Sequence, residues 1–166
     1  MKRTVVGTAI MLALLAAPLA APAQQKSAIQ LSSTSQVAVT EKNAQEEKET
    51  RLQDAAKAKV VPGDTVIFTT SYVNTSDKPV NNVTIMNPVP QHMAYVEKSA
   101  EGKGARIDFS VDGGKTYASP DKLTVKDTAG KVRPALGQDY THIRWVLAAP
   151  LAPGGKGSVS FKAKLQ

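Results

Sequence analysis

The sequence predicts an all-β protein folded as an antiparallel β-sandwich of about seven to nine strands. Three observations lead to this prediction. Short segments alternate apolar with polar residues at a period of two, as strands with one buried face do. Clusters of glycine, proline, asparagine and aspartate separate these segments at regular spacing. After the first 23 residues, no segment carries the apolar stripe of a core-facing helix.

The N-terminus predicts a secretory signal peptide over residues 1–23. Two basic residues at 2–3 precede an apolar run over 5–17, and the small residues of 21–23 form an Ala-x-Ala cleavage site. The apolar run is shorter than the ~20 residues that a membrane-spanning helix needs. We therefore expect an exported protein, periplasmic or at the cell surface, with no integral membrane segment after cleavage and a single β-sandwich domain over 24–166.

Composition narrows the classes of function. The chain has no cysteine, so its fold must rest on a hydrophobic core, and thiol redox chemistry and thiolate metal sites are excluded. Loss of the signal peptide leaves two fewer basic residues than the 21 of the whole chain, against 14 acidic ones. The lysines are scattered singly, whereas a nucleic-acid-binding protein concentrates them in a patch or stripe. We therefore expect no nucleic-acid partner.

The first strand after the signal peptide is predicted at 29–40, because its large apolar residues occupy odd positions and so share one buried face. The next segment, 41–59, carries charges of both signs and no apolar stripe. It could form a polar helix, a charged loop or a hairpin insertion whose second arm begins near Thr50. We favour a loop and a short strand, since an unpacked helix has little to hold it in water. The odd-numbered apolar residues are Ile29, Leu31, Val37 and Val39.

A turn at Pro62, Gly63 and Asp64 opens the next strand. Proline fixes φ, glycine supplies a positive φ, and the aspartate carboxylate accepts hydrogen bonds from the turn. The strand that follows, 65–73, is rich in β-branched and aromatic residues.

Asn74 begins a cluster of turn-forming residues that leads to a second core strand over 80–86. Val83 and Ile85 are expected to point inward, and Pro90 helps to end the strand because proline cannot donate to a ladder. The two strands and their turns are typical of a sandwich core.

The C-terminal half adds short strands and a clear final pair. The strand 141–147 places Trp145, the only tryptophan, at the centre of the predicted core and turns His142 and Arg144 toward solvent. The strand 158–165 alternates in the same way. Further short strands are predicted at 92–97, 107–111 and around 123–125, with a loop over 127–139 and a turn over 150–157 that contains Gly154.

Five short motifs occur together along this chain, at 61–66, 72–75, 82–85, 89–90 and 151–154. They resemble the conserved-repeat domain family, also catalogued as domain of unknown function eleven, which is found in exported and surface proteins of bacteria and archaea. The resemblance covers residue 29 to the C-terminus and implies an immunoglobulin-like sandwich with no general enzymatic activity. The chain departs from the family at Asn87, where aspartate is usual, and in having a single copy of a domain that often occurs in tandem.

The segment 110–117 resembles the Asp-box, a structural hairpin of sialidases and related propellers. Asp112 is expected to accept hydrogen bonds from backbone N–H groups of the turn, Gly113 and Gly114 to take positive φ, and Tyr117 to pack beneath it. The chain is too short for a propeller, so we interpret this segment as a structural turn.

No catalytic, cofactor-binding or metal-binding residue is predicted. The segment 114–116 mimics the end of a phosphate-binding loop but lacks the earlier glycine and the helix that such a loop requires. Nothing in the spacing of His92 and His142 brings them together with a carboxylate. Structural roles are predicted instead for Pro62, Gly63, Asp64, Asn74, Pro90, Asp112, Gly113, Gly114, Trp145 and Gly154.

These observations predict a non-enzymatic module with a structural, adhesion or interaction role in the cell envelope, where its partner would be an unknown envelope protein or polymer. An alternative is a filament or assembly subunit that donates its N-terminal strand, about 24–40, to a neighbour, and self-association through strand edges is a related hypothesis. Burial of Ile29 and Leu31 in the protein's own core would remove the motive for donation. A metal-binding protein or hydrolase is the least favoured class.

Overall fold

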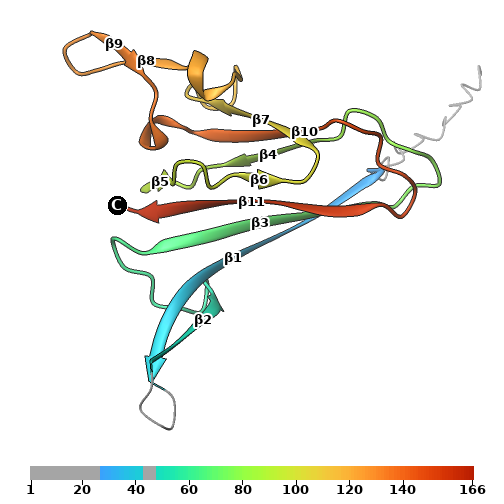
Figure 1. Ribbon diagram of the computed structural model, residues 1–166, viewed down its shortest axis with the longest axis horizontal. Helices are drawn as coiled ribbons and strands as arrows, with labels where there is room; N and C mark the ends of the chain where they lie inside the picture. Colours follow the sequence, from blue (N-terminus) through green and yellow to red (C-terminus); the bar gives the residue numbers. More distant parts are fainter. Residues whose placement is uncertain (1–26, 43–47) are drawn as a thin grey trace, which may run out of the picture.

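The computed structural model describes residues 27–42 and 48–166, so the predicted signal peptide lies outside the described residues. Two antiparallel sheets face each other and form a β-sandwich, which confirms the predicted fold class (Figure 1). The larger sheet has six strands and the smaller has three, within the predicted range of seven to nine. A separate two-stranded ribbon and two single-turn 3-10 helices lie beside the sandwich.

The larger sheet follows the order β2-β1-β3-β11-β5, and β6 also pairs with β11; the smaller sheet follows the order β4-β10-β7. The strands of the larger sheet are β1 (Ile29–Lys42), β2 (Lys48–Asp54), β3 (Thr65–Asn74), β5 (Met93–Tyr95), β6 (Glu101–Gly102) and β11 (Lys156–Leu165). Those of the smaller sheet are β4 (Thr84–Pro88), β7 (Ala105–Ser110) and β10 (His142–Leu147). The remaining elements are η1 (Pro120–Lys122), η2 (Gly137–Asp139) and the ribbon of β8 (Thr124–Lys126) and β9 (Val132–Pro134).

Two crossings between the sheets build the centre of the sandwich. The chain passes from β3 to β4 and later from β10 to β11, while β3 pairs with β11 and β4 pairs with β10. The apolar faces of these two pairs meet. Trp145 and Ile143 of β10 are fully buried, and the Trp145 ring lies 6.3 Å from the ring of Phe161 on β11. Alternation along each strand therefore supplies one continuous core, with Trp145 inside it as predicted.

The predicted loop over 127–139 contains more structure than the sequence suggested. It includes β9, which pairs with β8, and η2. The ribbon exposes Thr124, Lys126, Val132 and Pro134, so little apolar burial marks it in the sequence. The ribbon is held by hydrogen bonds between two short strands. Backbone pairing of this kind leaves no periodic pattern of apolar residues in the sequence.

Part of the segment 41–59 forms the second arm of a hairpin. Residues 48–54 form β2, which pairs antiparallel with the second half of β1, from Gln36 to Lys42. Asp54 then accepts a hydrogen bond from the N–H of Ala56 at 2.9 Å and ends the strand. Of the alternatives left open for this segment, the structure therefore has a hairpin.

The inward face of β1 is only partly covered, which differs from the prediction of one buried face. Val37 is buried and Ile29 packs partly against the core, but the Leu31 side chain is 52% exposed. The smaller sheet has three strands against six and does not extend across β1. Leu31 therefore points inward from β1 without a facing layer above it.

Candidate interaction surface

The turn before β3 is hydrogen-bonded to the end of β11. Gly63 has φ +98°, and its N–H donates to the carbonyl of Leu165 at 2.8 Å, while the Leu165 N–H donates to the carbonyl of Asp64 at 2.9 Å. The Asp64 carboxylate accepts the N–H of Val61 at 2.9 Å. Pro62 lies exposed at the start of this turn. The turn thus anchors the last residues of the chain to the start of β3.

Asn74 is a buried polar centre that joins two loops. Its side-chain amide donates to the carbonyls of Lys78 and Leu151 at 2.8 and 2.9 Å, and its Oδ1 accepts the N–H and the hydroxyl of Ser76. The residue is only 1% exposed. Gly154, at φ +68°, donates its N–H to the Asn74 carbonyl at 3.0 Å. Asn74 therefore satisfies the backbone of both turns at this end of the sandwich.

The Asp-box segment is a turn closed by Asp112. The carboxylate accepts the N–H groups of Lys115 and Thr116 at 3.0 Å and the hydroxyls of Thr116 and Ser110 at 2.6 and 2.7 Å. Gly113 and Gly114 have φ of +77° and +84°. The hydrogen bonds from Thr116, and then that from Ser110, hold the pKa of the Asp112 carboxyl well below its usual range. At neutral pH this carboxylate is committed to the turn.

At the same end of the sandwich as the Asp-box turn, near the start of β5, Pro90 closes a smaller turn. Its carbonyl accepts the N–H of Met93 at 3.2 Å. The neighbouring His92 has φ +62°, and its carbonyl accepts the N–H of Gln166 at 2.9 Å. Pro90 thus lies where the chain enters the edge of the larger sheet beside the C-terminus.

The outer face of the smaller sheet carries a charged cluster that sequence reasoning missed. Asp108, only 6% exposed, accepts hydrogen bonds from Arg144 at 2.8 Å and Arg106 at 3.2 Å. The Arg144 guanidinium lies 4.4 Å above the Tyr117 ring, and the Asp-box turn covers His142. His142 and Arg144 are therefore half-buried, although they lie on the predicted face. The sequence does show alternating residues along each strand. That these charged side chains meet on one face becomes visible only once β7 is paired with β10.

Within residues 27–42 and 48–166, no group of three or more histidine, cysteine, aspartate or glutamate side chains has the geometry of a metal site.

An aromatic hollow lies between β5 and β7, where the Phe109 and Tyr140 rings are 4.6 Å apart and the Tyr95 ring is 5.1 Å from that of Phe109. Burial raises the pKa of both tyrosines. These three rings belong to the buried core, so we interpret the hollow as part of the packing between the sheets.

The first half of β1 leaves one row of backbone groups without a neighbouring strand. The N–H of Thr75, which follows β3, donates to the carbonyl of Ala28 at 2.8 Å, and the N–H of Ala55 donates to that of Ser35 from the opposite side at 2.9 Å. Backbone groups alternate in direction along an antiparallel strand. The N–H and C=O groups of Ile29, Leu31 and Ser33 therefore point away from β3.

No strand in the described part of the chain pairs with that side of β1 between Ile29 and Thr34. From Ser27 to Thr40 the chain has no charged residue and no proline. Exposed edges in natural sheets usually carry such residues to prevent pairing with other chains. This uncharged row, which we call the β1 edge (residues 29–34), is the strongest candidate interaction surface.

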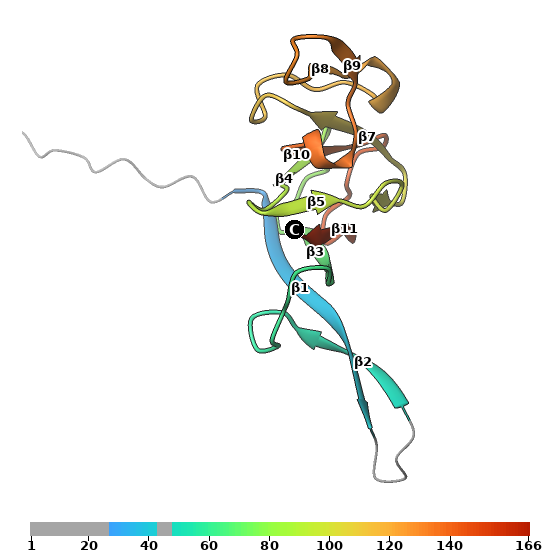
Figure 2. The same ribbon diagram turned by 90° about the vertical axis from the view of Figure 1, so that its left-hand side faces the viewer.

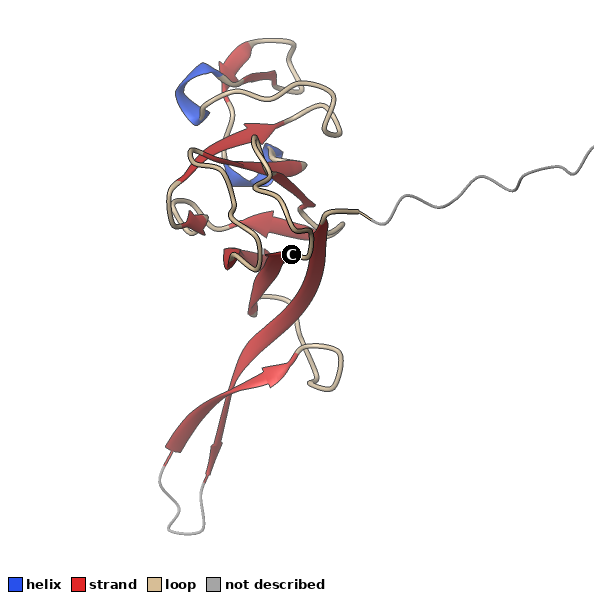
Figure 3. Ribbon diagram, turned by 90° about the vertical axis from the view of Figure 1, so that its right-hand side faces the viewer, coloured by secondary structure: helices blue, strands red, loops and turns tan. Residues whose placement is uncertain are grey.

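The second half of β1 and β2 form an arm, residues 36–42 and 48–54, that extends beyond the sandwich at the end opposite the β8–β9 ribbon (Figures 2 and 3). The Leu52 side chain on this arm is 54% exposed. The arm continues the larger sheet in the direction of β1. The β1 edge and the arm together form an extended margin on one side of the molecule.

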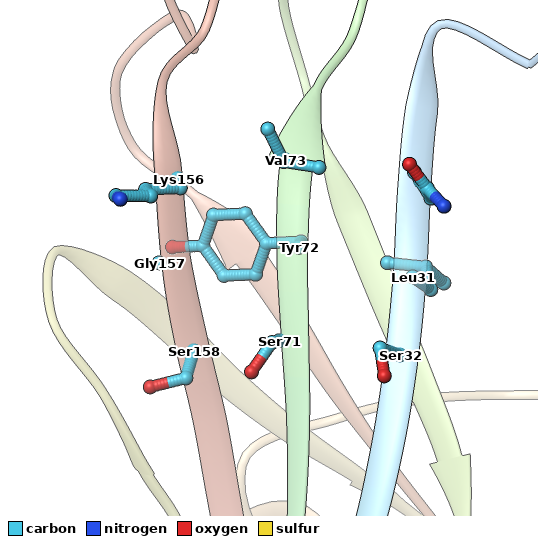
Figure 4. A pocket seen from close by; sticks show the side chains of 9 residues that line it. Leu31, Ser32, Ser71, Tyr72, Val73, Lys156, Gly157 and Ser158 are labelled. Carbon is cyan, nitrogen blue, oxygen red and sulfur yellow. The ribbon is translucent and has the colours of Figure 1, made fainter.

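The outer face of the larger sheet carries several hydroxyl groups beside the β1 edge. A shallow depression there is bordered by Ser32, Ser71 and Ser158 on one side and by Val73 and Lys156 on the other (Figure 4). Tyr72 lies in the row between these two sets, and its side chain turns to the inner face. There it packs over Gly157, the residue opposite it on β11, where a Cβ on residue 157 would collide with the phenol. The outer face therefore offers polar contacts next to the unpaired backbone.

Comparison with protein-family models, with curated proteins and with solved structures found no match to this chain. The resemblance to the conserved-repeat family stays a prediction from the motifs. Among the residues that the structure describes, no helix has the length and hydropathy needed to cross a membrane.

Proposed function

We propose that this protein is an exported, non-enzymatic β-sandwich module with a structural, adhesion or interaction role in the cell envelope, at the periplasmic or outer surface. The observation that carries the proposal is the β1 edge: an uncharged strand margin with outward-pointing backbone groups, continued by the arm. Such a margin binds an extended chain by adding it as a further strand. Immunoglobulin-like domains of surface proteins, which the motifs resemble, fit this role.

The polar residues that the sequence singled out support a scaffold role. Asp64, Asn74 and Asp112 each use their side chains on the backbone of their own turns. A carboxylate held in this way is not available as a general base. The proposal therefore places the activity of this protein on its margins rather than in a reactive site.

Edge binding fits the molecule better than donation of the N-terminal strand. β1 holds a register of nine residue pairs with β3, from Ile29 opposite Asn74 to Val37 opposite Val66. Donation to a neighbour would break that ladder and uncover the Val37 side of the core. An added strand at the β1 edge costs none of these bonds.

Export is tested by expressing the full chain in a Gram-negative host and measuring the mass of the protein in each cell fraction. We expect the exported form to begin at Gln24. An Ala23→Asp variant should keep the full mass, because the cleavage site requires a small residue there. Full-length wild-type protein confined to the cytosol would contradict the proposal.

The interaction role is tested by sedimenting the exported protein with isolated cell envelopes. Ser33→Pro should reduce retention several-fold, because it removes an N–H that points outward from β1 and leaves the backbone hydrogen bonds to β3 intact; of the bonds to β3 it removes the one between the Ser33 and Thr70 hydroxyls. Ser33→Ala is the matched control, since it removes only the hydroxyl and should be retained like the wild type. Equal retention of all three proteins would exclude the β1 edge as the binding element.

A further inference from the structure

The β1 edge has the length and the symmetry to pair with itself. We propose that it binds β1 of a second copy of this chain, antiparallel, so that two larger sheets join into one. The inference rests on the proposed function, in which this edge is the binding element, and it names the edge's partner. The pairing is centred on Leu31, which lies opposite Leu31 of the second copy, with Ile29 opposite Ser33.

The direction of the backbone groups selects this register. Ile29, Leu31 and Ser33 carry the outward-pointing groups, so a twofold pair must place these residues opposite one another. Centring the pair on Leu31 uses all three residues of each copy. Centring it on Gln30 or Ser32 would use only two.

The boundaries of the edge match this length. At its start, the carbonyl of Ile29 already accepts the Ser27 hydroxyl at 2.9 Å, which leaves its second lone pair for the N–H of Ser33 in the second copy. After it, the N–H of Ala55 occupies the carbonyl of Ser35, and pairing with β2 begins at Gln36. With Leu31 at the centre, Ala28 faces Thr34 of the second copy, so the pair ends just before the chain of either copy meets β2.

Charge favours a second copy over a partner of another kind. The exported form keeps 19 of the 21 basic residues against 14 acidic ones, so two copies repel each other wherever lysines meet. The β1 edge is a segment with no charged residue on either face, and its side chains are serine, threonine, glutamine, leucine and isoleucine. These side chains can stand opposite their own kind without like-charge repulsion. A charged peptide, in contrast, would find no complementary group along this edge.

Leu31 supplies the apolar centre of the contact. Its side chain points to the inner face beside Tyr72, is 52% exposed, and lacks a covering layer from the smaller sheet. In the twofold pair each Leu31 covers the other on the same face, as an isologous contact requires. The contact is smaller than that of a stable dimer, so we expect a weak, concentration-dependent association.

Sedimentation velocity of the exported protein over a concentration series tests the proposal. We expect the mean mass to rise from monomer toward dimer as concentration increases. Leu31→Lys should abolish the rise, because it sets two ammonium groups opposite each other. Leu52→Lys makes the same change at the exposed leucine of the arm and should dimerise like the wild type. Thermal melts of all three proteins should agree, which separates loss of pairing from loss of fold.

The register is tested by crosslinking, which the absence of native cysteine makes selective. A Leu31→Cys variant should be joined into a dimer by a short bismaleimide, whereas Leu52→Cys should not. A monomer at every concentration, or a dimer that Leu31→Lys leaves intact, would overturn the inference. Retention of a strictly monomeric protein on envelopes, lost with Ser33→Pro, would refute only the dimer and assign the edge to another envelope component. Dimers that do not bind envelopes would instead refute the proposed function.

Discussion

The sandwich and the arm share one strand, β1, but different interactions hold them. The first half of β1 pairs with β3 beside a core whose centre, Trp145, has no exposed surface. From Ala38 onward β1 pairs only with β2, and Leu52 there remains largely exposed. Hydrophobic burial therefore stabilises the sandwich, whereas the arm depends on hydrogen bonds that exchange with water at little net gain. A part of the sheet that contributes little to stability is free to serve binding.

The largest effect should come from the centre of the sandwich. Trp145→Ala removes a fully buried ring that contacts Phe161 and should lower the free energy of unfolding by about 3–5 kcal/mol. Urea unfolding followed by circular dichroism measures this loss, since the variant lacks the only tryptophan. A midpoint close to that of the wild type would mean that the core does not depend on this residue.

Asn74 should follow, because burial makes its hydrogen bonds costly to lose. Asn74→Ala leaves the carbonyls of Lys78 and Leu151 without their donor and should cost about 2–3 kcal/mol. The control is Ser76→Ala, which removes one donor to the Asn74 side chain at a more exposed position and should cost less than about 1 kcal/mol. Equal losses in urea unfolding would show that the loops do not depend on the asparagine.

Substitution of Gly113 in the Asp-box turn should lower the free energy of unfolding by less, because it acts only by straining the backbone. Gly113→Ala places a Cβ at φ +77° and should cost about 1 kcal/mol, whereas Lys115→Ala, in the same turn, should be nearly neutral. Thermal melting of the two variants decides between them. Equal tolerance at both positions would refute a glycine requirement in this turn.

Sequence reasoning succeeded where one strand carries its own signal. Strands β10 and β11 lie between turn-forming residues and alternate buried with more exposed positions, and the position of Trp145 follows from that alternation alone. It failed where the determinant lies on another strand. The charged cluster around Asp108 needs the pairing of β7 with β10, and the exposure of Leu31 follows from the width of the smaller sheet. Neither property is local, so no window of the sequence could contain it.

The pH dependence of the free energy of unfolding should show how much the Asp112 carboxylate stabilises the fold. Hydrogen bonds depress the pKa of the folded Asp112 carboxyl, so its contribution is present above the pKa of the unfolded carboxyl, about 4, and is lost as pH falls below that value toward the folded pKa. The urea midpoint of the wild type should therefore fall in acid, and Asp112→Asn should reduce that fall. Identical pH profiles for the two proteins would show that the hydrogen bonds to Asp112 do not stabilise the fold.

The smallest effect should be in the arm, and a matched pair of substitutions measures the contrast with the sandwich directly. Leu147→Ala removes a buried side chain on β10 and should cost about 2–5 kcal/mol. Leu52→Ala removes the same atoms where water already reaches them, so it should change stability by less than about 0.5 kcal/mol. Urea unfolding of both variants gives the two values under one set of conditions. A loss at Leu52 near that at Leu147 would mean that the arm packs against a surface in solution, and in a concentration-dependent form it would place that surface on another molecule.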